Sequence, residues 1–150
     1  MRMIVDGADT YVYTGARPLA PAQPAVLFVH GAAHDHSVWA LQSRYFAHHG
    51  RSVLAVDLPG HGRSQGGALP SVDAIADWLP RVLDAAGITR AALVGHSLGS
   101  LAALACAARH PDRVVKIALL GPAVPMIVSD ALLEAAAAAD HLAYELINSW

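Results

Sequence analysis

The chain has 150 residues, of which 55% are hydrophobic and 15% are charged. This composition is typical of one folded globular domain with a substantial core, and it excludes a disordered chain. Ten Lys and Arg side chains against twelve Asp and Glu give a formal net charge of -2. That balance argues against a nucleic-acid partner, because such partners select strongly basic surfaces.

Cysteine content and hydropathy indicate the compartment. A single cysteine, Cys106, leaves no pair for a disulfide framework and too few thiolates for a metal cluster. Residues 1–20 place charged side chains among short apolar pairs and lack the long apolar block of a secretory signal. No run reaches the roughly 18 apolar residues that span a membrane. We therefore expect a cytoplasmic protein without a membrane partner.

The first elements in chain order are two short apolar segments, residues 3–5 and 11–13, on either side of an Asp6-Gly7 pair. Asp-Gly between apolar segments is a strong turn signal, so we expect an antiparallel hairpin that leads into a sheet. Four dense apolar runs then predict the strands of that sheet. They are Ala25–Val29, Ser52–Val56, residues 91–94 and Val114–Leu120. Each run is nearly all apolar, as expected where helices cover both faces of a parallel sheet.

Helices alternate with these strands. Ser37 is expected to cap a helix over residues 38–49, and Ser71 a second helix whose apolar residues share one face before Gly87 ends it. A third, Ala-rich helix is expected from about residue 98 to 110, where a Pro-Asp pair stops it. This alternation, with right-handed crossovers, predicts an open, mostly parallel α/β sheet wound on both sides, preceded by the antiparallel hairpin.

After Leu120 the chain changes character. Gly121-Pro122 and Pro125 interrupt it, and Asp130 begins an Ala-rich stretch that we expect to be helical to the end.

The motif that carries chemistry is Gly95-His96-Ser97-Leu98-Gly99, placed between a predicted strand and a predicted helix. It matches the G-x-S-x-G nucleophile elbow in its required context. The sharp turn strains the backbone of the serine, so only small residues fit two positions before and after it. We interpret Ser97 as the nucleophile and the Leu98 N–H, at the positive end of the helix, as an oxyanion donor. Gly95, His96 and Gly99 would support the elbow.

A second motif follows the first dense strand, which ends in His30-Gly31-Ala32-Ala33. A backbone N–H of this loop is the expected second oxyanion donor, with Ala32 preferred and Ala33 as the fallback. Two such donors are worth about 3 kcal/mol each in comparable hydrolases. His30, Gly31, Ala33 and the later Met126 are predicted to line the pocket.

These two motifs, with Asp57-Leu58-Pro59-Gly60-His61-Gly62-Arg63-Ser64 between them, resemble the serine-nucleophile branch of the α/β-hydrolase superfamily in both content and order. The resemblance covers roughly residues 26–120. It implies the α/β-hydrolase fold, a small-molecule substrate, a cap that shapes the pocket, and neither a metal nor an organic cofactor. A serine nucleophile implies hydrolysis of an ester, a thioester or a vinylogous C–C bond. The 57–64 loop is mainly structural in that family and receives no catalytic role.

The resemblance extends over the N-terminal portion of the family pattern only. The family triad continues with Asp or Glu and then His on loops after later strands, and nothing after Leu120 matches them. We therefore expect residues 1–124 to be the N-terminal part of a hydrolase core, residues 125–150 to be the start of a truncated helical cap, and the isolated chain to be inactive. The last strand would expose an apolar edge that a missing C-terminal portion or an oligomer partner would cover.

Two alternatives stay open. His34, His36 and His61 lie on loops expected at the same end of the sheet as Ser97, so a substitute base is conceivable. His34 and His36 also flank Asp35, but a third and a fourth ligand at metal-binding spacing are lacking, so no metal is expected. The alternative to a carboxylesterase-like serine hydrolase is a non-catalytic ligand-binding module of the same fold, or one half of a split enzyme.

Overall fold

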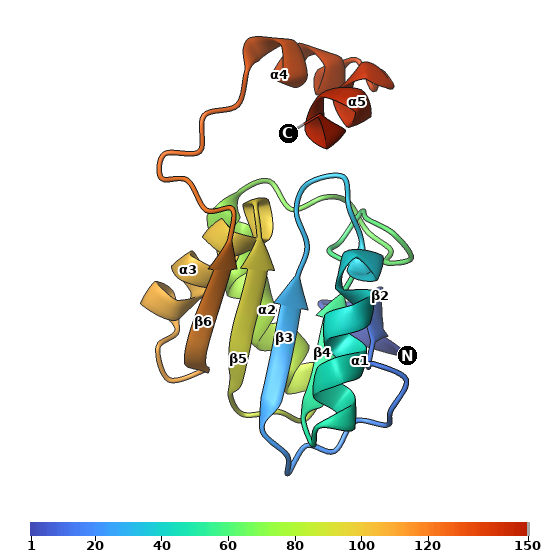
Figure 1. Ribbon diagram of the computed structural model, residues 1–150, viewed down its shortest axis with the longest axis vertical. Coiled ribbons are helices and arrows are strands. Elements are labelled where there is room, and N and C mark those ends of the chain that lie inside the picture. The colour runs from blue at the N-terminus through green and yellow to red at the C-terminus, as the bar shows by residue number, and fades with distance from the viewer. Residues whose placement is uncertain (150) are drawn as a thin grey trace.

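One six-stranded sheet organises the fold, and its strand order is β1-β2-β4-β3-β5-β6 (Figure 1). The computed structural model describes residues 1–149. The strands are β1 (Arg2–Val5), β2 (Ala8–Tyr13), β3 (Ala25–Val29), β4 (Ser52–Val56), β5 (Ala91–His96) and β6 (Val114–Leu120). β1 and β2 form the antiparallel start, and the pairs among β3, β4, β5 and β6 are parallel. The predicted fold class is confirmed.

Helices cover the sheet from both sides. The 3-10 helix η1 (His36–Trp39) and α1 (Ala40–His48) lie on one face, and α2 (Val72–Ala85) and α3 (Leu98–Arg109) lie on the other. Helices α4 (Asp130–Ala137) and α5 (Leu142–Asn148) lie beyond the end of the sheet and pack against each other (Figure 1). Alternate side chains of the central strands point to opposite faces of the sheet. Leu27 and Leu54 join the core cluster that includes α2 and α3, whereas Phe28 and Val53 pack with Trp39 and the side of α1.

The start of the first helix differs from the prediction. Asp35 is the cap, and its side chain accepts a hydrogen bond from the Ser37 backbone N–H. The predicted cap, Ser37, lies inside the 3-10 turn η1 that precedes α1. The carboxylate two residues earlier captures the first free N–H, so helical hydrogen bonding begins sooner and in the tighter 3-10 form.

The C-terminal stretch is two helices and not one. Ala138 follows α4 as its C-cap, Ala139 takes a positive φ of 53°, and the Asp140 side chain accepts from the N–H of Leu142 at the start of α5. That local hydrogen bond competes with helix continuation and explains the break. The predicted helical end at Trp150 lies outside the described residues. Over residues 1–149, none of the helices has both the length and the hydropathy needed to cross a bilayer.

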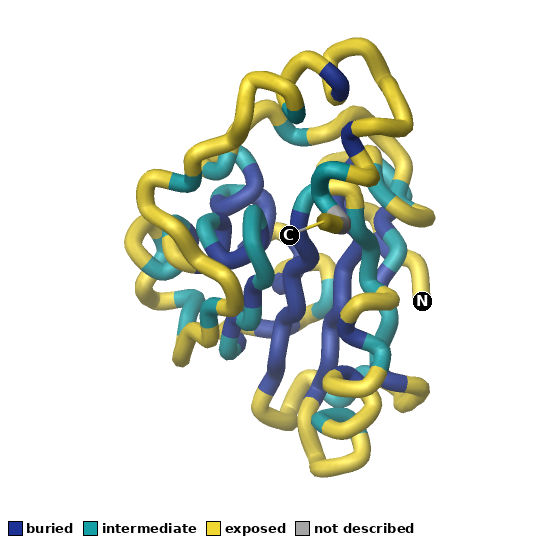
Figure 2. Tube along the Cα trace, turned by 45° about the horizontal axis from the view of Figure 1, so that its top comes forward, coloured by how far each residue is buried: buried dark blue, intermediate teal, exposed yellow. Residues whose placement is uncertain are grey.

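Burial is uneven across the sheet. β3 and β4 are buried at every residue, while β6, at the edge, exposes Val115, Ile117 and Leu120. Figure 2 shows the buried strands at the centre of the molecule and a largely exposed C-terminal segment. The fold therefore places β5, which carries the elbow at its end, between a closed core and an open edge.

Candidate active site

Ser97 occupies the turn between β5 and α3 and has a φ of 52° and a ψ of -120°. A non-glycine residue with this backbone conformation is strained and persists only where its surroundings hold it. The Ser97 N–H donates to the Leu120 carbonyl at 2.9 Å, and the Ser97 carbonyl accepts from the Ser100 N–H at 2.8 Å. The backbone on both sides is therefore fixed, whereas among residues 1–149 the Ser97 hydroxyl has only a 4.0 Å contact with the Met126 sulfur.

The two glycines of the motif allow close packing of the elbow. A methyl group on Gly95 would overlap the Gly99 carbonyl, and a methyl group on Gly99 would overlap the Val29 carbonyl. The beginning of α3 thus touches the ends of both β5 and β3, with no room for a side chain at either position. This is the geometry that the sequence pattern predicts.

Two backbone N–H groups lie beside the elbow without an acceptor in the part of the chain that the structure describes. Leu98 is the first residue of α3, and Ala32 follows β3, which is the parallel neighbour of β5. The Ala32 loop lies against the elbow, because a methyl group on Gly31 would be 3.2 Å from the Ser97 Cβ. Within residues 1–149, neither the Leu98 N–H nor the Ala32 N–H donates a hydrogen bond. Free N–H groups at a helix N-terminus suit a negatively charged oxygen.

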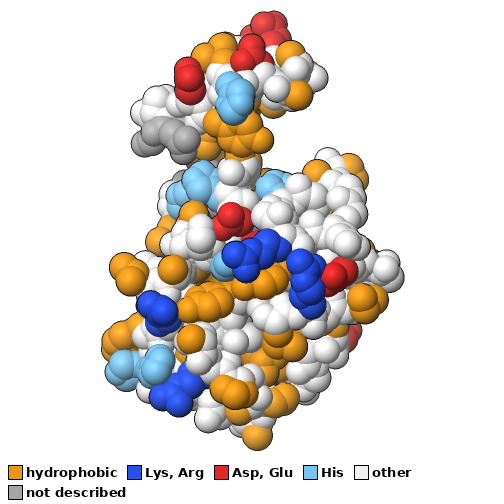
Figure 3. All heavy atoms as spheres, turned by 90° about the vertical axis from the view of Figure 1, so that its right-hand side faces the viewer, with side chains coloured by type: hydrophobic (Ala, Val, Ile, Leu, Met, Phe, Trp, Pro, Cys, Tyr) orange, Lys and Arg blue, Asp and Glu red, His pale blue; other side chains and the backbone are white. Residues whose placement is uncertain are grey.

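Each of the loop histidines uses one ring nitrogen, Nδ1, in a contact away from Ser97. His34 Nδ1 lies 2.7 Å from the Ala32 carbonyl, His36 Nδ1 lies 2.7 Å from an Asp57 oxygen, and His61 Nδ1 lies 3.0 Å from the Pro59 carbonyl. In the described part of the chain, none of these rings is hydrogen-bonded to Ser97. Figure 3 shows several histidine side chains gathered at the top of the core, below the C-terminal helices. The geometry therefore gives no support to a substitute base.

His30 differs from its prediction as a pocket-lining residue. Its side chain is fully buried, its Nε2 accepts from the Leu58 N–H at 3.0 Å, and its Nδ1 lies 2.7 Å from the Gly31 carbonyl. Burial, the largest cause, lowers the pKa of His30 to about 4. The ring thus stays neutral at pH 7 and links two loops inside the fold. Its exposure could not be judged from its place beside Gly31 in the sequence.

A buried carboxylate that sequence reasoning left without a partner braces the same loops. Asp57 is fully buried and accepts from the His36 N–H and the His36 ring at 2.7 Å each. Its other oxygen accepts from the Arg63 N–H at 2.9 Å. Ligand atoms of Asp35, His36 and Asp57 lie within 4.8 Å of one another. These hydrogen bonds, with the Asp35 bond to the Ser37 N–H, account for that cluster as a loop brace.

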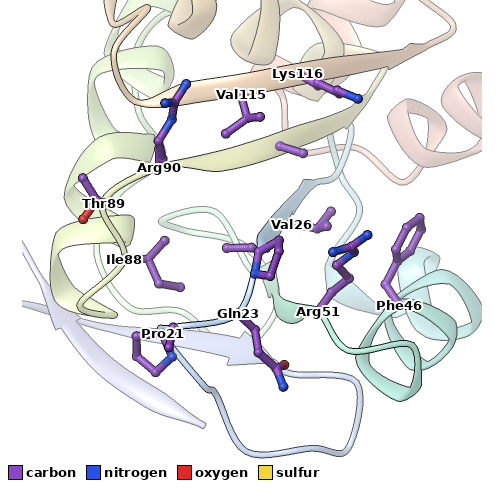
Figure 4. A pocket seen from close by; sticks show the side chains of 14 residues that line it. Pro21, Gln23, Val26, Phe46, Arg51, Ile88, Thr89, Arg90, Val115 and Lys116 are labelled. Carbon is purple, nitrogen blue, oxygen red and sulfur yellow. The ribbon is translucent and has the colours of Figure 1, made fainter.

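An open hollow of about 590 Å³ lies away from Ser97, at the beginnings of the parallel strands. Its floor includes Val26, Ala92 and Val115, and Figure 4 shows Arg51 and Arg90 at its margin. Ser97 follows the opposite end of β5. The hollow is therefore distinct from any pocket above the elbow.

Comparison with known proteins places this fold in one family. A family described as alpha/beta hydrolase fold matches residues 24–147. Among solved structures, epoxide hydrolase A from Mycobacterium thermoresistibile superposes with a TM-score of 0.70 at 26% identity, covering 91% of this chain and 43% of that one. A predicted hydrolase from Thermoplasma acidophilum, at 21% identity, shares the fold with a TM-score of 0.72 over 79% of this chain and 60% of that one. The chain belongs to the α/β-hydrolase family.

Two relatives of known name are similar to this chain in sequence. The lipase LipV of Mycobacterium tuberculosis is 38% identical over 109 residues, which are 71% of this chain and 40% of that protein. A 2-hydroxy-6-oxononadienedioate/2-hydroxy-6-oxononatrienedioate hydrolase of Burkholderia vietnamiensis is 34% identical over 126 residues, which are 81% of this chain and 43% of that protein. The chain thus spans well under half the length of both relatives.

Proposed function

We propose that this chain carries the nucleophile of a serine hydrolase that cleaves an ester, thioester or related acyl bond of a small molecule, with a C–C bond as a further substrate type. The observation that carries the proposal is the positive φ of Ser97 between β5 and α3, with its hydroxyl unused by the backbone. The matches to a lipase and to a hydrolase of an oxo-dienedioate support it.

The reaction would begin with attack of the Ser97 oxygen on the acyl carbon. The carbonyl oxygen would gain negative charge and be held by the free N–H groups of Leu98 and Ala32, each worth about 3 kcal/mol of transition-state stabilisation. Collapse of the tetrahedral intermediate would release the alcohol or thiol, which takes up the Ser97 proton from the general base, and would leave an acyl group on Ser97. Water would then hydrolyse that ester and restore the free hydroxyl.

The general base and its acid partner are proposed to come from polypeptide beyond these 150 residues. Within residues 1–149, neither the His34 ring nor the His36 ring is hydrogen-bonded to Ser97, and their Nδ1 atoms contact the Ala32 carbonyl and Asp57. LipV extends well beyond the region matched by this chain. Loss of the histidine of a serine protease costs about 10⁶-fold in turnover. The 150-residue chain alone would therefore turn over substrate very slowly.

The segment after β6 is proposed to form the beginning of a cap over the nucleophile. Met126 lies on this segment, and its sulfur is 4.0 Å from the Ser97 oxygen. A flexible thioether at this place would contact the acyl chain of a bound substrate.

Reaction with a fluorophosphonate tests the proposal. The full-length protein is expected to gain one phosphonyl adduct, located on Ser97 by tandem mass spectrometry. Ser97→Ala should abolish it, whereas Ser37→Ala, a matched change at an exposed serine of η1, should leave labelling intact. A folded protein that binds short esters saturably but forms no adduct and releases no product would refute the enzyme and favour the binding module.

A further inference from the structure

The loop that carries Ala32 is held by a ring whose proton can be placed by elimination. The Leu58 N–H can only donate, so His30 Nε2, 3.0 Å away, must be the acceptor and carry no proton. A neutral imidazole then has its single proton on Nδ1. That nitrogen lies 2.7 Å from the Gly31 carbonyl oxygen. The ring therefore accepts from Leu58 and donates to Gly31.

The Gly31 carbonyl and the Ala32 N–H belong to one peptide unit. The unit is planar and trans, so its C=O and N–H bonds point in opposite directions. A ring that holds the carbonyl therefore also sets the direction of the N–H. The His34 N–H donates to the same carbonyl at 3.4 Å, a longer and weaker contact.

The far end of the loop is fixed by the same partner loop. Asp57 accepts from the His36 N–H at 2.7 Å, and the adjacent Leu58 N–H engages His30. The segment from residue 31 to 35 is thus tied to residues 57 and 58 at both of its ends. Gly31 lies against Ser97, because a Cβ added to Gly31 would be 3.2 Å from the Ser97 Cβ.

We propose that His30 is a positioning residue, which turns the Ala32 N–H toward the Ser97 hydroxyl by holding the Gly31 carbonyl in the tautomer that Leu58 imposes. This inference rests on the proposed function only in treating the Ala32 N–H as an oxyanion donor. The 57–64 loop then acts on the site through His30 without touching the substrate.

The ring tautomer is tested on the unmodified 150-residue chain. Nitrogen-15 NMR of the imidazole at pH 7 should show a protonated Nδ1 and an unprotonated Nε2, with a hydrogen-bond coupling between Nε2 and the Leu58 N–H. A protonated Nε2 would overturn the inference. This measurement needs neither a variant nor catalytic activity.

Two variants separate the two ring bonds. The shorter amide of His30→Asn can still donate to the Gly31 carbonyl but not reach Leu58, whereas the longer amide of His30→Gln reaches Leu58 and loses Gly31. We expect the order parameter of the Ala32 N–H to be about 0.85 in the unmodified chain and in His30→Asn, and to fall below about 0.6 in His30→Gln. Unchanged Leu93 resonances would show that the core is intact.

Equal Ala32 order and orientation in both variants would contradict the proposal. Fluorophosphonate labelling of the full-length protein adds a separate readout, with a loss of about 10²-fold or more expected for His30→Gln. If the unmodified protein is not labelled, the proposed function fails, and the Ala32 measurements still decide whether His30 positions the loop.

Discussion

β5 and β6 are paired neighbours with similar apolar content, yet only β5 is enclosed. Leu93 in β5 is 1% exposed, whereas Ile117, its registered partner in β6, is 39% exposed. α3 packs against both strands, but β5 lies between β3 and β6, whereas β6 has a paired strand on one side only in the described part of the chain. Apolar composition therefore predicts a strand, while burial depends on what the rest of the polypeptide supplies.

The largest expected effect is a difference in stability between substitutions at paired positions of β5 and β6. Leu93→Ala should lower the free energy of unfolding by about 4 kcal/mol, because it leaves a cavity in a closed core. Ile117→Ala at the paired position should lower it by less than about 1 kcal/mol, since its side chain already meets water. Urea denaturation of the 150-residue chain measures both. Similar losses for the two variants would show that β6 is covered as β5 is.

Low pH should destabilise the fold through protonation of His30. Burial is the main cause of its lowered pKa of about 4, assisted by His61 and opposed by the Gly31 carbonyl, Asp57 and Asp35. The unfolded chain binds a proton near pH 6.5, but the folded chain does so only near pH 4. The stability of the fold is therefore complete above pH 6.5, falls as the pH drops toward 4, and loses up to about 3 kcal/mol.

The matched control is His30→Gln, which cannot titrate in this window. The difference in unfolding free energy between the unmodified chain and the variant, from urea titrations at pH 7, 5.5 and 4.5, should shrink as the pH falls. A difference independent of pH would mean that His30 keeps an ordinary pKa in the fold.

The close packing of the elbow predicts a smaller loss. Gly99→Ala should destabilise the chain by about 2 kcal/mol, because the new methyl group would overlap the Val29 carbonyl and push α3 from β3. Gly67→Ala is the control, since nothing lies within 4 Å of its added methyl group and its φ is not in the left-handed region. Thermal unfolding should separate the two variants, and equal midpoints would refute the packing argument.

Local constraints explain how much of the fold and the candidate site the sequence predicts. The dense runs give the parallel strands, and the small residues around Ser97 give the elbow, because each of these signals lies within a few residues. The predicted start of the first helix is wrong, because the Asp35 side chain accepts a hydrogen bond from a backbone N–H within the same loop. The break after Ala138 was missed because helix propensity hid the competing Asp140 side chain.

Long-range partners explain what the sequence could not give. His30 looked like a pocket residue because its partner Leu58 lies 28 positions away, and no short motif links the two. Asp57 had no visible role for the same reason, since its hydrogen bonds reach back 21 positions to His36. Both residues act through loops that only the folded sheet brings together.

The smallest expected change in stability carries the most information about the open edge. Val115 and Ile117 expose apolar surface on β6, and we propose that further polypeptide or a second copy covers it. Ile117→Lys should change the unfolding free energy by no more than about 0.5 kcal/mol, yet reduce self-association seen by sedimentation velocity, because a charge at the strand edge opposes pairing. Leu41→Lys, at an exposed leucine of α1, is the control and should leave association unchanged. If both substitutions reduce association equally, net charge and not the β6 edge controls it.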